Sequence, residues 1–160
     1  MAPDYLRWAD RNWGVLIRLM GGHAKLYRAT GGIIGHHFPG APEMLLLDHV
    51  GAKSAIKRTT PLVFARDSLS RGKDGGSNIV LIASKGGYPK SPAWYHNLKA
   101  NPDTTVQIGP KLIDVHAREA KPEEYERLWS LAVEVYGGYE AYRHRTDRKI
   151  PLMVLEPTTS

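Results

Sequence analysis

Apolar and polar residues follow two different spacings along this chain, which predict strands in some stretches and helices in others. Residues 79–83 are five consecutive apolar side chains, and such a run, rich in β-branched residues, indicates a strand buried on both faces. Shorter apolar or alternating stretches predict further strands at 44–50, 104–108, 111–120 and 150–155. The Gly109-Pro110 pair predicts a hairpin turn between two of these strands, and Pro151 places the last one at an edge or at its own start.

The amino-terminal segment has the spacing of an amphipathic helix. Its apolar face comprises Leu6, Ala9, Trp13, Leu16, Ile17 and Met20. Arg7, Arg11 and Arg18 share another face, a pattern that fits both a helix docked on its own domain and one lying at a membrane surface. We expect Gly21-Gly22 to end this helix.

Helices are also predicted in the second half of the chain. Ser91 as N-cap and Pro92 at the first helical position open a helix that runs to residue 100. Asn97 falls on its apolar face with Trp94, so the amide either contacts a ligand or satisfies a neighbouring loop. A further helix begins at 122 and ends at the Gly137-Gly138 pair, where a short helix follows.

These elements predict a mainly β fold with added helices. We expect four or five antiparallel strands joined by hairpins, forming a small barrel with helices packed outside. The polar, glycine-rich stretch 66–77 is interpreted as a mobile hairpin tip. The chain then forms a single domain, with residues 1–30 as an amphipathic helical segment and residues 31–160 as the barrel.

Composition limits the classes of function. The 160 residues contain no cysteine, which excludes a thiolate nucleophile and any cysteine-based metal site. His36-His37 lacks a third ligand at useful spacing, so we expect no metal. Lys and Arg number 22 against 16 Asp and Glu, a net charge of +6 that attracts nucleic acid, anionic lipid or a polyanionic small molecule. Neither a secretory signal nor a spanning helix is expected, because charges interrupt the first residues and apolar runs are short.

Two stretches carry candidate binding chemistry. The strand at 79–83 ends in Ser84-Lys85-Gly86-Gly87, where glycines permit close backbone approach and the lysine adds charge; a ligand cradle and an ordinary turn both fit. The second stretch interleaves three cations with three hydroxyls: Lys53, Ser54, Lys57, Arg58, Thr59 and Thr60. Ammonium, guanidinium and hydroxyl groups all donate to anionic oxygens, so this stretch is either a phosphate or carboxylate clamp or a solvated turn.

Three separated motifs resemble the deazaflavin (F420)-dependent nitroreductase family of actinobacteria. They are Gly51-Ala52-Lys53-Ser54 with 58–62, then 83–87 with 92–102, and Tyr136, Tyr139 and Tyr142 with 146–151. The likeness covers roughly residues 43–157, and its middle motif is the most specific. Two positions depart from the family pattern: Ala52 stands where an Arg is frequent and Ala55 where a Gly is frequent, which concerns affinity for the coenzyme tail.

The resemblance implies an FMN-binding-type split β-barrel over residues 31–160. It also implies hydride transfer from reduced coenzyme F420 to a quinone, an activated enone or a nitro compound, the protein holding the ring and excluding water. Carried over by position, the residues for the coenzyme are Lys53, Ser54, Arg58, Pro61, Ala83, Ser84, Lys85, Gly86, Trp94 and Asn97, joined by Lys57 from the clamp. Ser84, Tyr139 and Tyr136 would face the substrate.

Other classes of function stay open from the sequence. One is a related split-barrel reductase that uses FMN, and another is a non-enzymatic basic module that binds nucleic acid or lipid. Under the favoured interpretation the partner is a small acceptor molecule and no nucleic acid is bound. The expected location is cytoplasmic, with peripheral contact to the inner face of the cell membrane through the amino-terminal helix as the alternative.

Overall fold

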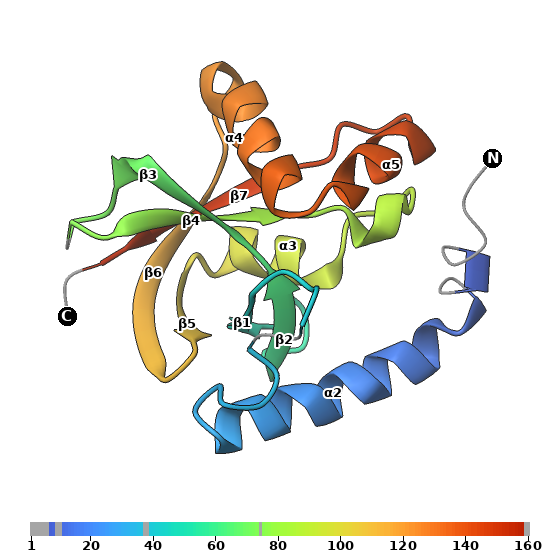
Figure 1. Ribbon diagram of the computed structural model, residues 1–160, viewed down its shortest axis with the longest axis vertical. Coiled ribbons are helices and arrows are strands. Elements are labelled where there is room, and N and C mark those ends of the chain that lie inside the picture. The colour runs from blue at the N-terminus through green and yellow to red at the C-terminus, as the bar shows by residue number, and fades with distance from the viewer. Residues whose placement is uncertain (1–6, 9–10, 37–38, 74, 159–160) are drawn as a thin grey trace.

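The computed structural model describes residues 7–8, 11–36, 39–73 and 75–158, and within them the strands form one sheet (Figure 1). The strands are β1 Met44–Val50, β2 Lys57–Val63, β3 Ala65–Arg71, β4 Ser77–Ile82, β5 Asp103–Ile108, β6 Lys111–Glu119 and β7 Leu152–Pro157. Their order is β2-β1-β5-β6-β7-β4-β3, and every pairing is antiparallel. The mainly antiparallel fold is confirmed, but the described residues contain seven strands rather than four or five.

Helices cover the sheet on more than one side. They are α2 Trp13–Ala29, the 3₁₀ turn η1 Lys85–Gly87, α3 Ala93–Ala100, α4 Pro122–Val135 and α5 Gly138–Arg145. Figure 1 shows α3 inside the curl of the sheet, with α2 along β1 and β2 and the α4–α5 pair on the other side. The helix α3 begins one residue later than expected, because Pro92 is its extended N-cap residue.

Successive side chains of β4 point alternately into two apolar cores, which explains why that strand is apolar throughout. Ile79 and Leu81 belong to the core inside the curl, together with Trp94 and Leu98 of α3. The intervening Val80 and Ile82 pack under α4 and α5 instead, with Leu128, Trp129 and Tyr139. A strand between two apolar cores needs no polar face, so the predicted double-sided burial is confirmed.

The sheet is open at one seam. β2 and β3 stand at opposite ends of the strand order, yet only the buried Phe64 separates them in sequence. A single residue cannot span a flat sheet of this width, so the two ends must converge at Phe64 and the sheet must curl. The sheet and its outer helices therefore form a split β-barrel.

The interpretation of 66–77 as a mobile hairpin tip was wrong for most of that stretch, because the connection is confined to the residues between Arg71, where β3 ends, and Ser77, where β4 begins. Residues 65–71 form the edge strand β3, which pairs with β4. Asp67 on this strand is buried, and its two carboxylate oxygens accept from Arg127 of α4 at 2.7 and 2.8 Å. The polar residues misled the prediction because an edge strand exposes much of its surface, so its composition resembles that of a loop.

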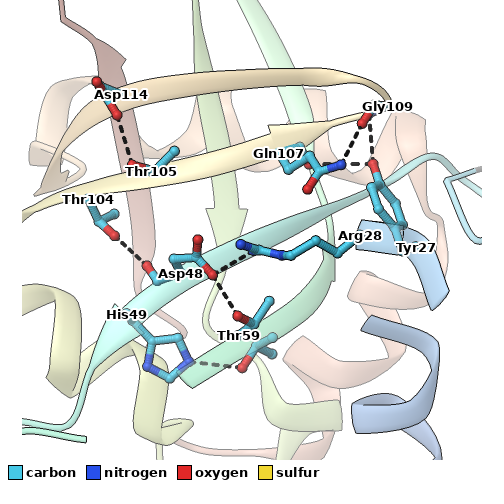
Figure 2. A network of polar contacts seen from close by, with 11 residues as sticks. Tyr27, Arg28, Asp48, His49, Thr59, Thr104, Thr105, Gln107, Gly109 and Asp114 are labelled. Atoms are coloured by element: carbon cyan, nitrogen blue, oxygen red, sulfur yellow. Dashed lines mark hydrogen bonds and ion pairs between the residues drawn. The ribbon is translucent and has the colours of Figure 1, made fainter. Parts of the chain in front are cut away.

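The helix α2 continues through Gly21-Gly22 to Ala29, contrary to the expected end. Two interior glycines cost about 1 kcal/mol each relative to alanine, but packing of the following turn offsets that cost. Tyr27 is fully buried, its hydroxyl accepts the Gly109 N–H, and Arg28 pairs with Asp48 of β1 at 2.7 Å (Figure 2). The predicted stripe residues Leu6 and Ala9 and the side chains of Trp13 and Ile17 lie outside the described residues. No helix in the described part of the chain is long and apolar enough to cross a membrane.

Candidate functional site

A cleft lies where α2, β2, the start of α3 and the end of β4 meet. It consists of two adjoining cavities of about 670 and about 340 Å³. Both cavities are lined by Met20, Thr60, Pro61, Lys85, Pro92 and Trp94. The cationic stretch before β2 and the glycine-rich end of β4 therefore share one cleft, although some 25 residues of chain and an edge strand separate them.

The larger cavity is the cationic half of the cleft. Lys57 and Arg58 line it from β2, Lys25 from α2 and Lys85 from the end of β4. Four cations in one concavity raise the local concentration of anions, and their N–H groups are donors for phosphate or carboxylate oxygens. The sequence analysis did not single out Lys25, because residues 1–30 were expected to form a helical segment separate from the barrel.

The smaller cavity is the aromatic half of the cleft. Tyr136, Tyr139 and Tyr142 line it together with Ser84. The rings of Tyr136 and Tyr139 meet edge to face with centroids 5.1 Å apart, and the hydroxyls of Tyr136 and Tyr142 are 3.2 Å apart. Burial raises the pKa of Tyr139 well above that of an ordinary tyrosine, so its phenol stays protonated and is a hydrogen-bond donor at neutral pH.

The turn after β4 has an unusual backbone. Lys85, Gly86 and Gly87 have φ values of +47°, +63° and +75°, three consecutive residues in the left-handed region. That region is costly for lysine, and strain of this kind tends to occur at functional sites. At Gly87 a Cβ atom would lie 2.7 Å from the Tyr142 carbonyl oxygen, so only glycine lets α5 approach this closely.

Two arginines hold this turn by its carbonyl groups. Arg145 Nη1 donates to the Gly86 oxygen at 2.9 Å. Arg148 donates from Nη2 to the carbonyls of Ala83 and Ser84, and from Nε to Tyr88, all at 3.0 Å. Burial lowers the pKa of Arg148, but a guanidinium remains charged at neutral pH. The strained turn is therefore held in place from α5 and the segment that follows it.

A buried polar chain lies behind the cationic half. Asn97 accepts the Ala52 N–H on Oδ1 and contacts His49 Nδ1 through Nδ2, both at 2.9 Å. His49 Nε2 lies 2.9 Å from Thr60 Oγ1, and His49 itself lines the cleft. Burial, reinforced by Arg58 and opposed by Asp48, lowers the pKa of His49, so the imidazole is neutral at neutral pH. His49 went unnoticed in the sequence because it falls inside a strand without any motif.

The remaining predicted residues lie outside the lining of either cavity. Lys53 and Ser54 occupy the exposed turn before β2, where Ser54 Oγ accepts the Ile56 N–H at 3.3 Å. Asn97 is buried behind His49, and it does satisfy a neighbouring loop through Ala52. Ala83 and Gly86 contribute carbonyl oxygens to the arginine contacts just described. His36 contacts Tyr27 and Met44, whereas His37 lies outside the described residues.

The fold and the cleft together define a class of protein. A split β-barrel with a cationic half-cleft beside an apolar, aromatic one suits a planar ring that carries an anionic tail, and the cavity sizes match those of small-molecule sites. The chain is thus a ring-cofactor-binding split barrel.

Comparisons with known proteins specify the family. A sequence model described as F420H(2)-dependent quinone reductase matches residues 19–157. The F420H(2)-dependent quinone reductase Rv1261c of Mycobacterium tuberculosis is 47% identical over 156 residues, which cover 95% of this chain and 97% of that protein. A solved structure titled as an F420-H2 dependent reductase (FDR-A) has a TM-score of 0.59 and 45% identity, covering 71% of this chain and 93% of its own.

A second solved structure, described as a domain-swapped dimer, has a TM-score of 0.62 and 38% identity, covering 92% of this chain and 98% of its own. The chain belongs to the F420H(2)-dependent quinone reductase family. It is an oxidoreductase, and reduced coenzyme F420 is its cofactor. The FMN-dependent and non-enzymatic alternatives are therefore set aside.

Proposed function

We propose that the chain reduces a quinone-type acceptor in the aromatic half of the cleft while coenzyme F420 is held across both halves. The observation that carries this proposal is the shared wall of the two cavities, formed by residues such as Pro61, Lys85 and Trp94. When bound, the reduced coenzyme supplies a hydride, that is, one proton and two electrons. The protein then needs no nucleophile of its own, and its task is to position both reactants and exclude water.

We assign the cationic half to the anionic tail of the coenzyme. Lys57 and Arg58 line that half, and Lys25 adds a third cation from α2. Charge-assisted hydrogen bonds to phosphate are shorter and stronger than neutral ones, which favours this end for the tail. Lys53 and Ser54, exposed on the preceding turn, are assigned to the outermost carboxylates of the tail.

The ring of the coenzyme is assigned to the wall that the two cavities share. Pro61 and Trp94 offer apolar surface there, Lys85 adds a polar group from the strained turn, and Ser84 lies beside this wall in the aromatic cavity. Ala83, Gly86 and Asn97 shape this wall from behind rather than lining it. The arginine contacts to the turn keep its backbone in one arrangement before any ligand arrives.

Ser84 and Tyr139 are assigned to the acceptor, with Tyr136 packed beside them. Both residues line the aromatic cavity, and the protonated Tyr139 can donate to an oxygen on which negative charge develops. Activated enones and nitro compounds make the same demand, because each gains charge on an oxygen when a hydride arrives. We propose these compounds as further acceptors.

Turnover tests the proposed function directly. Reduced coenzyme F420 mixed with the protein and menadione should regain the absorbance of the oxidised deazaflavin, at a rate proportional to protein concentration. Tyr139→Phe should lower kcat at least tenfold, since one preorganised donor is lost. Tyr95→Phe is the matched control, because Tyr95 is buried in α3 outside the cleft. The proposal fails if no quinone, enone or nitro compound is reduced, or if both variants behave alike.

Peripheral membrane contact is a second proposal, and it rests on α2. Val15, Leu19 and Leu26 form an exposed stripe on the face away from Tyr27, with side chains 54%, 63% and 47% exposed. Arg18 lies beside this stripe, on the side of the helix from which Lys25 reaches the cleft. The described members of the predicted apolar face, Leu16 and Met20, are instead half-buried toward the protein.

Vesicle binding tests this second proposal. An apolar stripe with basic residues along one side favours anionic lipid surfaces, so the protein should co-sediment with phosphatidylglycerol vesicles more than with phosphatidylcholine vesicles. Leu19→Glu should abolish the binding, whereas Leu112→Glu, at an exposed position on β6, should not. Equal recovery of both variants with anionic vesicles would overturn the proposal.

A further inference from the structure

The hydrogen-bond chain behind the cleft has a direction that its chemistry dictates. The Ala52 backbone N–H can only donate, so the atom of Asn97 that receives it at 2.9 Å must be the amide oxygen. The other terminal atom of Asn97 is then the NH₂ group, which can only donate to His49 Nδ1. Nδ1 therefore accepts and carries no proton.

The same logic fixes the next step. A neutral imidazole holds one proton, and with Nδ1 accepting, that proton resides on Nε2. Nε2–H then donates to Thr60 Oγ1 at 2.9 Å. Within the described part of the protein, His49 is the hydrogen-bond partner of the Thr60 hydroxyl. The proton of that hydroxyl is therefore left for a group that is not part of the protein.

The position of Thr60 decides what that outside group is. Thr60 lines both cavities of the cleft, next to Pro61 and within the wall that also contains Trp94. Its side chain is half-buried at the end of the polar chain, and an accepted hydrogen bond strengthens a hydroxyl as a donor. A planar ring against this wall is best matched if it presents a carbonyl oxygen or an unprotonated nitrogen there.

We propose that Thr60 is a specificity-determining donor to an acceptor atom of the ring bound in the cleft, and that His49 and Asn97 are positioning residues that keep its hydroxyl proton pointed outward. The proposal deepens the proposed function, on which it rests. It predicts selection against a ring that places an N–H at this point, because two donors would then face each other.

Nuclear magnetic resonance of the ligand-free protein tests the positioning half. With uniform ¹⁵N labelling, the two-bond and three-bond couplings of the His49 ring report which nitrogen carries hydrogen. The proposal expects the Nε2–H tautomer at neutral pH. A proton on Nδ1, or a doubly protonated ring at that pH, would overturn it, and neither reading depends on activity.

Binding tests the specificity half. Thr60→Val keeps the shape and removes the hydroxyl, while Thr60→Ser keeps the hydroxyl. Fluorescence titrations use coenzyme F420 and the deazaflavin analogue of riboflavin, which has the ring without the phosphate tail. Thr60→Val should bind both roughly 3- to 10-fold more weakly, the usual effect of one neutral hydrogen bond, and Thr60→Ser should stay within about twofold of the natural chain. Unchanged binding by Thr60→Val contradicts the proposal, and a loss confined to F420 contradicts the assignment to the ring.

A double-mutant cycle separates action through Thr60 from general damage. His49→Phe should weaken ring binding in the natural chain but add nothing in the Thr60→Val background, because the group it positions is already absent. Independent, additive losses would show that His49 does not act through Thr60. Failure of the proposed function looks different, since the unaltered chain would then fail to turn over any acceptor while the His49 tautomer stayed as expected.

Discussion

Arg148 donates from Nη2 to the main-chain carbonyl oxygen of Ser84 at 3.0 Å, and so ties a residue of the candidate site to the segment after α5. The same guanidinium also donates to the carbonyl oxygens of Ala83 and Tyr88, which lie on either side of the strained turn. One planar group thus fixes both ends of the turn. Lysine, a single point charge, cannot reproduce three such bonds.

Arg148→Lys should therefore destabilise the protein by about 2–3 kcal/mol and weaken coenzyme binding as well. Chemical denaturation and coenzyme titration measure the two effects. Arg143→Lys is the matched control, because Arg143, in the preceding helix α5, forms an exposed ion pair with Glu126 of α4. That control should cost no more than about 0.5 kcal/mol. Similar losses of stability and of coenzyme affinity in both variants would show that the hydrogen bonds of the Arg148 guanidinium have no special role.

Two glycines should respond to alanine in opposite directions. Gly87 has φ +75° and no room for a Cβ atom, so Gly87→Ala should destabilise the protein by about 2 kcal/mol or more. Gly22 lies inside α2 with nothing within 4 Å of a Cβ atom, so Gly22→Ala should stabilise it by about 0.5–1 kcal/mol. Thermal unfolding of both variants checks this pair. Stabilisation by Gly87→Ala would mean that the turn is described wrongly.

Ala55 is the position where the family frequently has glycine, and here its φ is +55°. An L-residue in the left-handed region costs about 1–2 kcal/mol. Replacement by glycine removes that cost, but glycine loses more chain entropy on folding than alanine does, which offsets part of the gain. Ala55→Gly should therefore raise the free energy of unfolding by about 0.5 kcal/mol. Ala52→Gly in the same turn, without a positive φ, should lower it slightly. If Ala52→Gly raised the free energy of unfolding and Ala55→Gly lowered it, Ala55 would not be a strained residue.

Stability should fall as pH drops below about 6.5 because of His49. Burial and Arg58 lower its pKa in the folded state, against the opposing effect of Asp48, so the unfolded chain takes up a proton first. The loss begins near the unfolded pKa of 6.5 and levels off below the folded one, whereas above 6.5 His49 has no effect. His49→Phe should flatten this part of a stability–pH curve. An unaltered slope in His49→Phe would exclude His49 as its source.

The fold was predictable where one physical signal dominated. The run at 79–83 and the hairpin around Gly109-Pro110 follow from burial pattern and turn chemistry alone, and β4, β5 and β6 confirm them. The edge strand β3 was missed because most of its polar side chains face solvent, while the one buried carboxylate, on Asp67, is satisfied by Arg127 of α4, a contact distant in sequence. The full length of α2 was missed for a similar reason, since contacts of Tyr27 with the barrel compensate for its glycines.

The sequence predicted the polar chemistry of the candidate site, but it did not predict which side chains line the cleft. Lys57, Arg58 and Pro61 do meet Ser84 and Trp94 in one cleft; residue chemistry singled out Lys57, Arg58 and Ser84, whereas only the family resemblance singled out Pro61 and Trp94. Whether Lys53 or Asn97 lines that cleft depends on side-chain direction, which spacing does not encode. His49 and Lys25 enter the cleft only because the sheet curls and α2 docks on it, and no local pattern marks either residue.

The central claim is that one cleft holds a planar ring on its shared wall and an anionic tail in its cationic half. The most direct measurement compares the affinities of coenzyme F420 and of the tail-less deazaflavin for the natural chain and for Arg58→Ala. The account predicts roughly tenfold weaker binding of F420 by the variant and, for the tail-less ring, a change of less than about twofold. Equal losses for both ligands, or no loss for F420, would contradict it.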